Sequence, residues 1–170
     1  ARETQRLVSA MSTAAADGDL PQVDTLRPKL YAPRARSDGL SPAVIDRLTL
    51  NEDRLAAIAK DVRTVAALPD PVGESLEMRT LPKGMMVGKM RVPFGVIGAI
   101  FESRPNVTVD IAVLCLKSGN ACILRGGKEA ARTNRALANL VREAVIEAGL
   151  PEDAVQLVRS TDRDLVMEML

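Results

Sequence analysis

Three short polar segments hold the residues that could bind a ligand or do chemistry. They span residues 102–106 (ESRPN), 125–128 (RGGK) and 159–162 (RSTD). Each follows a short apolar run, which is typical of a buried strand in a parallel sheet. Because ligands of open α/β sheets bind at the carboxyl ends of the strands, these three segments together form the predicted site.

The second segment has the pattern of a phosphate-binding turn. Gly126 and Gly127 carry no side chain where a strand turns into a helix, so backbone N–H groups and the helix N-terminus could approach an anion. The alternative is that the two glycines only shape the turn. Neither a G-x-G-x-x-G nor a Walker A sequence is present, so the common dinucleotide and P-loop fingerprints are missing.

The composition excludes several other chemistries. The 170 residues include no His, which rules out a Ser-His-Asp triad and every His-ligated metal site, and we predict no metal. A net charge of +1 and an aromatic content of 2% argue against a nucleic-acid partner. The longest apolar stretch, residues 92–101, is well short of the roughly 20 residues that cross a bilayer, so no membrane partner is expected.

The two cysteines are expected to be core residues rather than nucleophiles. Cys115 lies in the middle of an apolar helical pattern, and Cys122 lies inside an apolar strand pattern. Their separation also fails the C-x-x-C redox spacing, which argues against a thiol redox protein. So few cysteines do not suit a disulfide scaffold, and a reducing cytoplasm is the expected location.

Capping residues, prolines and the spacing of apolar residues predict the elements of the first half of the chain. Residues 1–39 show no regular pattern and are expected to be an irregular N-terminal segment, followed by a short helix over residues 42–48. Thr49 and Glu52 form a predicted capping box for the next helix, which Pro69 ends. Beyond it, residues 75–92 are expected to form a projecting hairpin.

The second half alternates strands with helices. Strands are expected over residues 94–100, 121–124 and 155–158, and helices over residues 107–117, 129–148 and from Ser160 or Asp162 onward. The first of these strands is apolar throughout, so we expect it to be central in the sheet and covered on both faces. The alternation predicts an α/β fold with a right-handed, doubly wound parallel sheet.

Two longer stretches resemble a known family. Residues 92–110 (VPFGVIGAIFESRPNVTVD) and 114–130 (LCLKSGNACILRGGKEA) are similar to the γ-glutamyl phosphate reductase family of the aldehyde dehydrogenase superfamily. With the segment up to residue 73, the resemblance covers residues 40–170, and residues 12–39 lack the long amphipathic helix that the family would show there. It implies that residues 40–170 are the N-terminal part of a Rossmann-like NADP-binding domain that is incomplete at its C-terminus.

The resemblance also implies an activity. It is the NADPH-dependent reduction of L-glutamyl 5-phosphate to L-glutamate 5-semialdehyde with release of phosphate, in proline biosynthesis. A cysteine thiolate displaces the phosphate, and the cofactor reduces the resulting thioester. The chain ends before the part that carries this cysteine, so we expect the chain alone to be inactive. The alternative function is a non-catalytic α/β module that binds a nucleotide or a partner protein.

Each site residue has an implied role and an alternative. Asn106 would donate its amide to the oxyanion, or it could cap a helix that begins at Val107. Arg104 would bind the phosphate or carboxylate of the small-molecule substrate, or it could pair with Glu102. The residues assigned to the adenosine ribose of NADP, with two cations for the 2′-phosphate, are Arg125, Gly126, Gly127, Lys128 and Thr161.

The hairpin has an implied role too. In a family of this type it would be an arm through which copies of the chain form a homo-oligomer. Its cations, Arg79, Lys83, Lys89 and Arg91, could instead form an anion patch or a charged edge that prevents unwanted strand pairing. Arg125 and Lys128 of the second segment also have an alternative, which is an ordinary pair of solvated surface cations.

Overall fold

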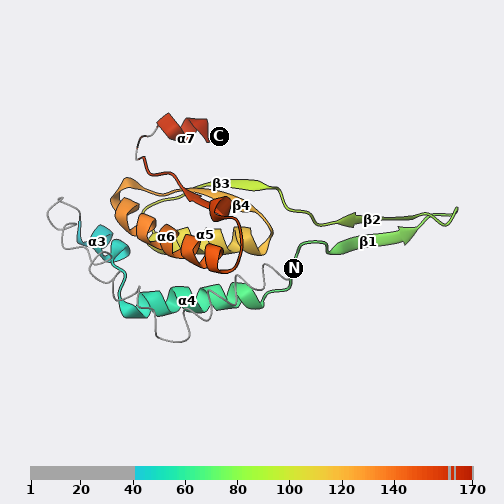
Figure 1. Ribbon diagram of the computed structural model, residues 1–170, viewed down its shortest axis with the longest axis horizontal. Helices are drawn as coiled ribbons and strands as arrows, with labels where there is room; N and C mark the ends of the chain where they lie inside the picture. Colours follow the sequence, from blue (N-terminus) through green and yellow to red (C-terminus); the bar gives the residue numbers. More distant parts are fainter. Residues whose placement is uncertain (1–40, 161, 163, 170) are drawn as a thin grey trace.

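The computed structural model describes residues 41–160, 162 and 164–169, so the expectations for residues 1–39 and for Thr161 lie outside the described residues. Figure 1 shows helices packed against a small sheet, with a hairpin that projects from this body. The elements are α3 (Pro42–Leu48), α4 (Glu52–Ala67), β1 (Ser75–Thr80), β2 (Met86–Met90), β3 (Val96–Ile100), α5 (Pro105–Lys117), β4 (Ala121–Arg125), α6 (Ala131–Glu147), β5 (Val155–Leu157) and α7 (Asp164–Glu168).

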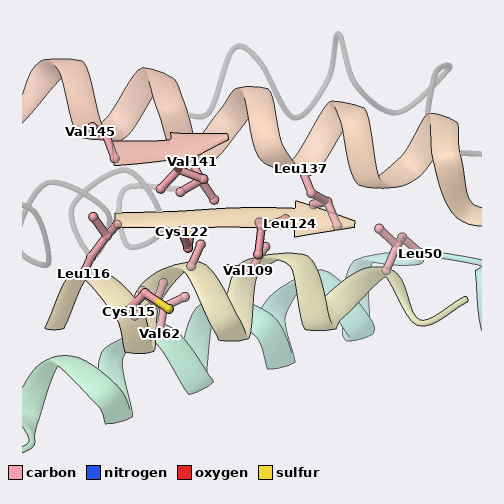
Figure 2. Packing of buried hydrophobic residues seen from close by; sticks show 13 residues of the cluster. Leu50, Val62, Val109, Cys115, Leu116, Cys122, Leu124, Leu137, Val141 and Val145 are labelled. Atoms are coloured by element: carbon pink, nitrogen blue, oxygen red, sulfur yellow. The ribbon is translucent and has the colours of Figure 1, made fainter. Parts of the chain in front are cut away.

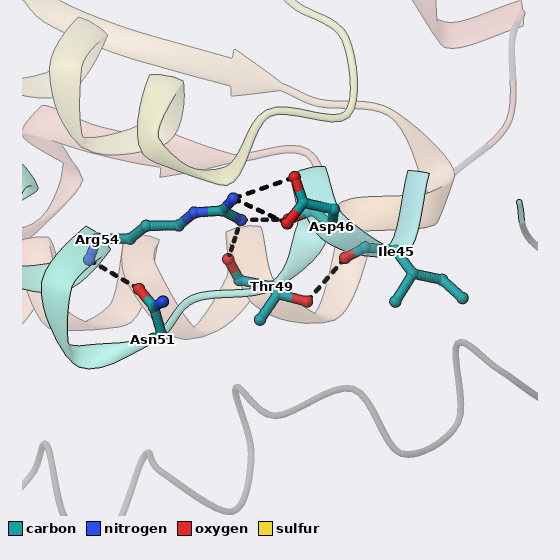
Figure 3. Close-up of polar contacts among 5 residues, drawn as sticks. All are labelled: Ile45, Asp46, Thr49, Asn51 and Arg54. Carbon is teal, nitrogen blue, oxygen red and sulfur yellow. Dashed lines mark hydrogen bonds and ion pairs between the residues drawn. The ribbon is translucent and has the colours of Figure 1, made fainter. Parts of the chain in front are cut away.

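The junction between α3 and α4 differs from the predicted capping box. The N-cap of α4 is Asn51, whose side-chain oxygen accepts from the N–H of Arg54 at 2.9 Å. Thr49 instead donates its hydroxyl back to the carbonyl of Ile45, at the end of α3 (Figure 3). Thr49 is the C-cap of the short helix, and a residue that ends one helix is not placed to begin the next.

Arg54 ties the two helices together at this junction. Its guanidinium donates to both carboxylate oxygens of Asp46, to the Asp46 carbonyl and to the Thr49 carbonyl (Figure 3). The Asp46 carbonyl also accepts from the Thr49 N–H at 3.2 Å, and a cation near the last carbonyls of a helix is favoured by the helix dipole. The chain therefore enters α4 at a fixed angle to α3.

The sheet of the main body is parallel, with the strand order β3-β4-β5. Ile97 pairs with Cys122, which pairs with Val155, so these three side chains lie on the same face. The expectation that β3 is central is wrong for the described residues, because β4 holds that place. Periodicity marks a strand as apolar but does not say which neighbours it pairs with.

Helices α5 and α6 cover one face of this sheet. The two helices pack against each other, so they lie on the same side of the sheet. Their apolar residues form one buried cluster with the inward side chains of β4 and β5 (Figure 2). Both crossovers run in the same direction along the sheet, so right-handed connections place both helices on that side. Helix α4 packs on α5, where Lys117 of α5 donates to the Ala66 carbonyl of α4 at 3.2 Å.

The other face of β3 is open over the described residues. Val96 is 62% exposed and Ile100 is 43% exposed, whereas Met169 approaches this face near Gly98. The expectation that both faces of this strand are covered is therefore not met by the described part of the chain. The α/β class, the parallel sheet and the projecting hairpin are all confirmed.

The hairpin pairs β1 with β2 in antiparallel register, and it extends away from the body (Figure 1). Gly84 has a φ of 82° in its turn, a conformation that glycine adopts without strain. Two of its cations are paired across the strands or at their ends: Lys89 with Glu77 at 2.6 Å and Arg91 with Glu74 at 2.8 Å. These pairs neutralise two of the four cations that the alternative of an anion patch would need.

Candidate functional site

The three polar segments meet at the carboxyl edge of the sheet. Ser103, after β3, donates its hydroxyl to the Glu129 carboxylate, after β4, at 2.7 Å. Arg125, the last residue of β4, donates to the carbonyl of Asp162, after β5, at 3.2 Å. The parallel register places the three strand ends side by side, so residues far apart in the sequence contact each other directly.

Asn106 is exposed in the first turn of α5. The helix begins at Pro105 and Arg104 occupies the N-cap position, so the alternative in which Asn106 caps a helix beginning at Val107 is wrong. Its amide nitrogen donates to the Asp110 carboxylate at 3.0 Å. A side-chain amide has two N–H donors, so one remains for a ligand. The contact with Asp110 also determines which end of the amide is the nitrogen.

The carboxyl group of Asp110 is itself perturbed. Burial raises its pKa above the ordinary value of 3.8, the hydrogen bond from Asn106 opposes this, and the nearby Asp61 carboxylate raises the pKa further. Burial has the largest effect. A carboxylate that is partly removed from water is a strong acceptor for the Asn106 amide.

Arg104 lies at the mouth of the same loop with an exposed side chain. Its backbone N–H donates to the Glu102 carbonyl at 2.8 Å, but within the described part of the chain the two side chains form no ion pair. The alternative of a local ion pair is therefore not seen. The guanidinium faces solvent, where a phosphate or a carboxylate can reach it.

Arg125 and Lys128 differ in their surroundings. Arg125 alternates with the inward residues Cys122 and Leu124, so its side chain lies on the face of the sheet opposite α5 and α6, and it is tied to Asp162. Lys128 is exposed in the single helical turn Lys128–Ala130 that precedes α6. The two predicted cofactor-binding cations thus lie at the same strand end but are not equivalent.

Gly126 and Gly127 have ordinary backbone conformations, but neighbouring side chains lie too close to leave space for a Cβ. Gly127 has a φ of −62°, and the φ of Gly126 is also outside the left-handed range. A Cβ at Gly126 would overlap the Asn134 amide and lie 2.9 Å from the Phe101 ring. The space above the glycines is filled by side chains of the chain itself, which the sequence pattern did not indicate.

Asn134 borders the candidate site, although no local sequence pattern placed it there. It is 1% exposed and it borders a small open pocket at the ends of β4 and β5, with Gly126, Arg135, Arg159 and Ser160. Its side-chain oxygen is buried without a partner among the described residues. The sequence shows only that Asn134 lies three and four residues before Leu137 and Ala138, so a polar residue interrupts the buried stripe of α6.

Both cysteines are buried free thiols, as expected. The hydrogen bond with the Cys115 thiol and burial raise the pKa of the Cys122 thiol well above its usual range. A thiolate is the nucleophilic form, so the Cys122 thiol is not suited to covalent catalysis. Within the described ranges, no group of three or more acidic or thiol side chains converges as a metal site would require.

Among the described residues, no helix combines the length and the apolar character needed to cross a membrane.

Comparisons with known proteins place the chain in a family. Residues 50–170 match the aldehyde dehydrogenase family, and the chain belongs to it. A gamma-glutamyl phosphate reductase from Dehalococcoides mccartyi is 60% identical over 136 residues, which are 80% of this chain and 32% of that protein. The resemblance stated from the sequence is therefore confirmed. The chain spans about a third of the length of the curated relatives it matches.

Solved structures agree with this assignment. The crystal structure of gamma-glutamyl phosphate reductase from Thermotoga maritima matches 99% of this chain and 40% of its own, with a TM-score of 0.87 and 37% sequence identity. The enzyme of the same name from Saccharomyces cerevisiae matches 96% of this chain and 42% of its own, with a TM-score of 0.79 and 32% identity. The fold is that of the aldehyde dehydrogenase family, whose members use nicotinamide dinucleotides.

Proposed function

We propose that the protein containing this chain reduces L-glutamyl 5-phosphate to L-glutamate 5-semialdehyde, with release of phosphate, in proline biosynthesis. The observation that carries the proposal is the 60% identity over 136 residues to a relative with the name of this enzyme. The geometry supports it, because the loop with Asn106 and the loop with Lys128 meet at one edge of the sheet. The nucleophilic cysteine of this proposal is neither Cys115 nor Cys122, because both thiols are buried in the core.

Asn106 would act on charge that develops during the reaction. Attack on an acyl carbon converts a carbonyl oxygen into an oxyanion, and a fixed amide N–H stabilises that charge more than it stabilises the substrate. The contact with Asp110 holds the amide in place at the helix N-terminus. Arg104 would bind the phosphate or the carboxylate of the substrate from the same loop.

The cofactor proposed is NADP, bound at the residues that follow β4 and β5. When bound, the reduced dinucleotide supplies the hydride. Lys128 offers an exposed cation at this edge and Arg125 a second cation at the same strand end, which suits the 2′-phosphate that distinguishes NADP from NAD. The same site would be bordered by Gly126, Gly127 and Thr161. At the two glycines, neighbouring side chains of the chain leave no room for a larger residue.

We also propose that the hairpin joins copies of the chain into a homo-oligomer and that the enzyme acts in the cytoplasm. The hairpin region exposes large apolar residues, namely Met78, Met85, Met86, Met90, Val92 and Phe94, the last of which is 92% exposed. Exposed apolar patches of this kind mark interaction surfaces. The two buried free thiols suit a reducing compartment.

The experiment that tests the activity uses the complete polypeptide. L-glutamate 5-semialdehyde and inorganic phosphate are supplied with NADP, and formation of NADPH is followed at its absorbance maximum. We expect turnover that requires phosphate and that is faster with NADP than with NAD. Dinucleotide binding without phosphate-dependent turnover would instead favour the non-catalytic α/β module.

A further inference from the structure

The loop that carries Asn106 and the loop that carries Lys128 touch at Gly127. The backbone of Gly127 has φ −62° and ψ 150°, an extended conformation that any residue adopts. A Cβ there would overlap the Ser103 hydroxyl and would lie 3.1 Å from the Glu129 carboxylate and 3.2 Å from the Ser103 backbone nitrogen. A side chain at position 127 would have to displace the Ser103 hydroxyl, because the first loop lies directly against the second.

A hydrogen bond closes this contact. The Ser103 hydroxyl donates to the Glu129 carboxylate at 2.7 Å, and an ionised acceptor makes such a bond stronger than a neutral one. The contact lies just beyond the end of the β3–β4 ladder, where the Phe101 N–H donates to the Arg125 carbonyl at 3.0 Å. Ser103 precedes Asn106 by three residues, and Glu129 directly follows Lys128.

We propose that Ser103, Gly127 and Glu129 form an interloop joint, with Ser103 as a positioning residue that holds the Asn106 loop at a fixed distance from the cofactor loop. This inference rests on the proposed function. Transfer between two bound molecules requires the reacting atoms to lie about 3–3.5 Å apart, and a displacement of 1 Å can cost about a hundredfold in rate. Because Asn106 and Lys128 would act on different molecules, the joint determines how those molecules meet.

The test is a double-mutant cycle in the complete polypeptide. Ser103→Ala should lower kcat about tenfold and change the Kd for NADPH less than twofold, since it removes one charge-assisted hydrogen bond between the loops. Ser103→Thr, which keeps the hydroxyl, should retain most of kcat. Gly127→Ala should lower both kcat and the melting temperature, because the new methyl group displaces Ser103.

The double variant S103A/G127A provides a readout that does not depend on activity. Removing the hydroxyl makes room for the methyl group, so its melting temperature should be higher than the sum of the two single effects predicts. Ser118→Ala is the matched control: it also removes a serine hydroxyl that donates, to the Leu114 carbonyl at 2.8 Å, but at the far end of α5. It should lower the melting temperature without lowering kcat.

The outcomes separate the two proposals. Wild-type kcat in Ser103→Ala, or additive melting temperatures in the cycle, would overturn the joint while leaving the proposed function intact. Absence of turnover in the wild-type protein would instead overturn the proposed function, and the thermal cycle would still decide whether Ser103 and Gly127 are in contact.

Discussion

Replacing Lys128 by Ala tests the proposed choice of cofactor. Lys128 is an exposed residue at the start of the turn before α6, so we expect removal of its side chain to leave the packing of that turn unchanged. A hydrogen bond to a charged group contributes about 1.5–3 kcal/mol, which corresponds to about 10- to 100-fold in Kd. Exposure and salt screening place the expected effect near the lower limit, about tenfold for NADPH and close to none for NADH.

Arg125 predicts a different pattern because it also has a structural contact. Its guanidinium donates to the Asp162 carbonyl at 3.2 Å, so Arg125→Ala frees the segment that follows β5. We therefore expect Arg125→Ala to weaken both dinucleotides, with an additional loss for NADPH. The contrast between the two variants comes from the structure, since both residues are equivalent cations in the sequence.

Titration calorimetry of each variant with NADPH and NADH, at two stated ionic strengths, measures these effects. The selectivity lost in Lys128→Ala should shrink at the higher ionic strength, because an exposed charge contact is screened. Lys83→Ala, at the tip of the hairpin, is the matched control and should change neither Kd. Equal weakening of NADPH and NADH by Lys128→Ala would refute the assignment of Lys128 to the 2′-phosphate.

Three further predictions concern the same edge of the sheet. Asn106→Ala should lower kcat about 100-fold with little change in the Kd for NADPH, and a loss of melting temperature alone, with kcat preserved, would remove Asn106 from the chemistry. Gly126→Ala should destabilise the fold by about 1–3 kcal/mol because its methyl group overlaps Asn134, and denaturant unfolding should show partial recovery when Asn134→Ala is added. Because the pKa of Asp110 is raised in the folded protein, the native state binds the carboxyl proton more tightly than the unfolded state. The contribution of Asp110 to stability is therefore greatest at low pH and is lost as the pH rises from about 3.8 through the raised pKa. Asp110→Asn should flatten that slope in denaturant titrations between pH 4 and 7, and an unchanged slope would contradict the burial of this carboxyl group.

Local patterns in the sequence identified most of the elements. Pro82 and Gly84 favour a turn within residues 75–92, where the hairpin is found, and Gly149, with a φ of 74°, follows the long helix predicted to end at residue 148. These features depend on residues that are neighbours in the chain, so composition and spacing are sufficient to find them. The same holds for the burial of Cys115 and Cys122, because apolar neighbours in a periodic pattern imply a common buried face.

The two wrong predictions, the capping box and the central place of β3, concern sequence patterns that fit more than one structure. Thr49 and Asn51 are both good N-cap residues, and only the end of α3 at Leu48 decides that Thr49 closes that helix while Asn51 opens the next. In the same way, the apolar run of β3 suits either a central or an edge strand. Its position depends on pairing with β4, which lies more than twenty residues further along the chain.

Local sequence patterns locate the candidate site, but they do not show the contacts within it. The polar segments after the three strands can be found from the sequence, because each apolar run ends at a polar turn, and Gly126 and Gly127 lie in the second segment. The reason for glycine at these two positions emerges from the folded chain, where Asn134 approaches Gly126 from α6 and Ser103 approaches Gly127 from the loop after β3. Such contacts depend on the spacing of strands in the sheet and on the packing of α6, which are set by long-range pairing and close packing rather than by neighbours in the chain.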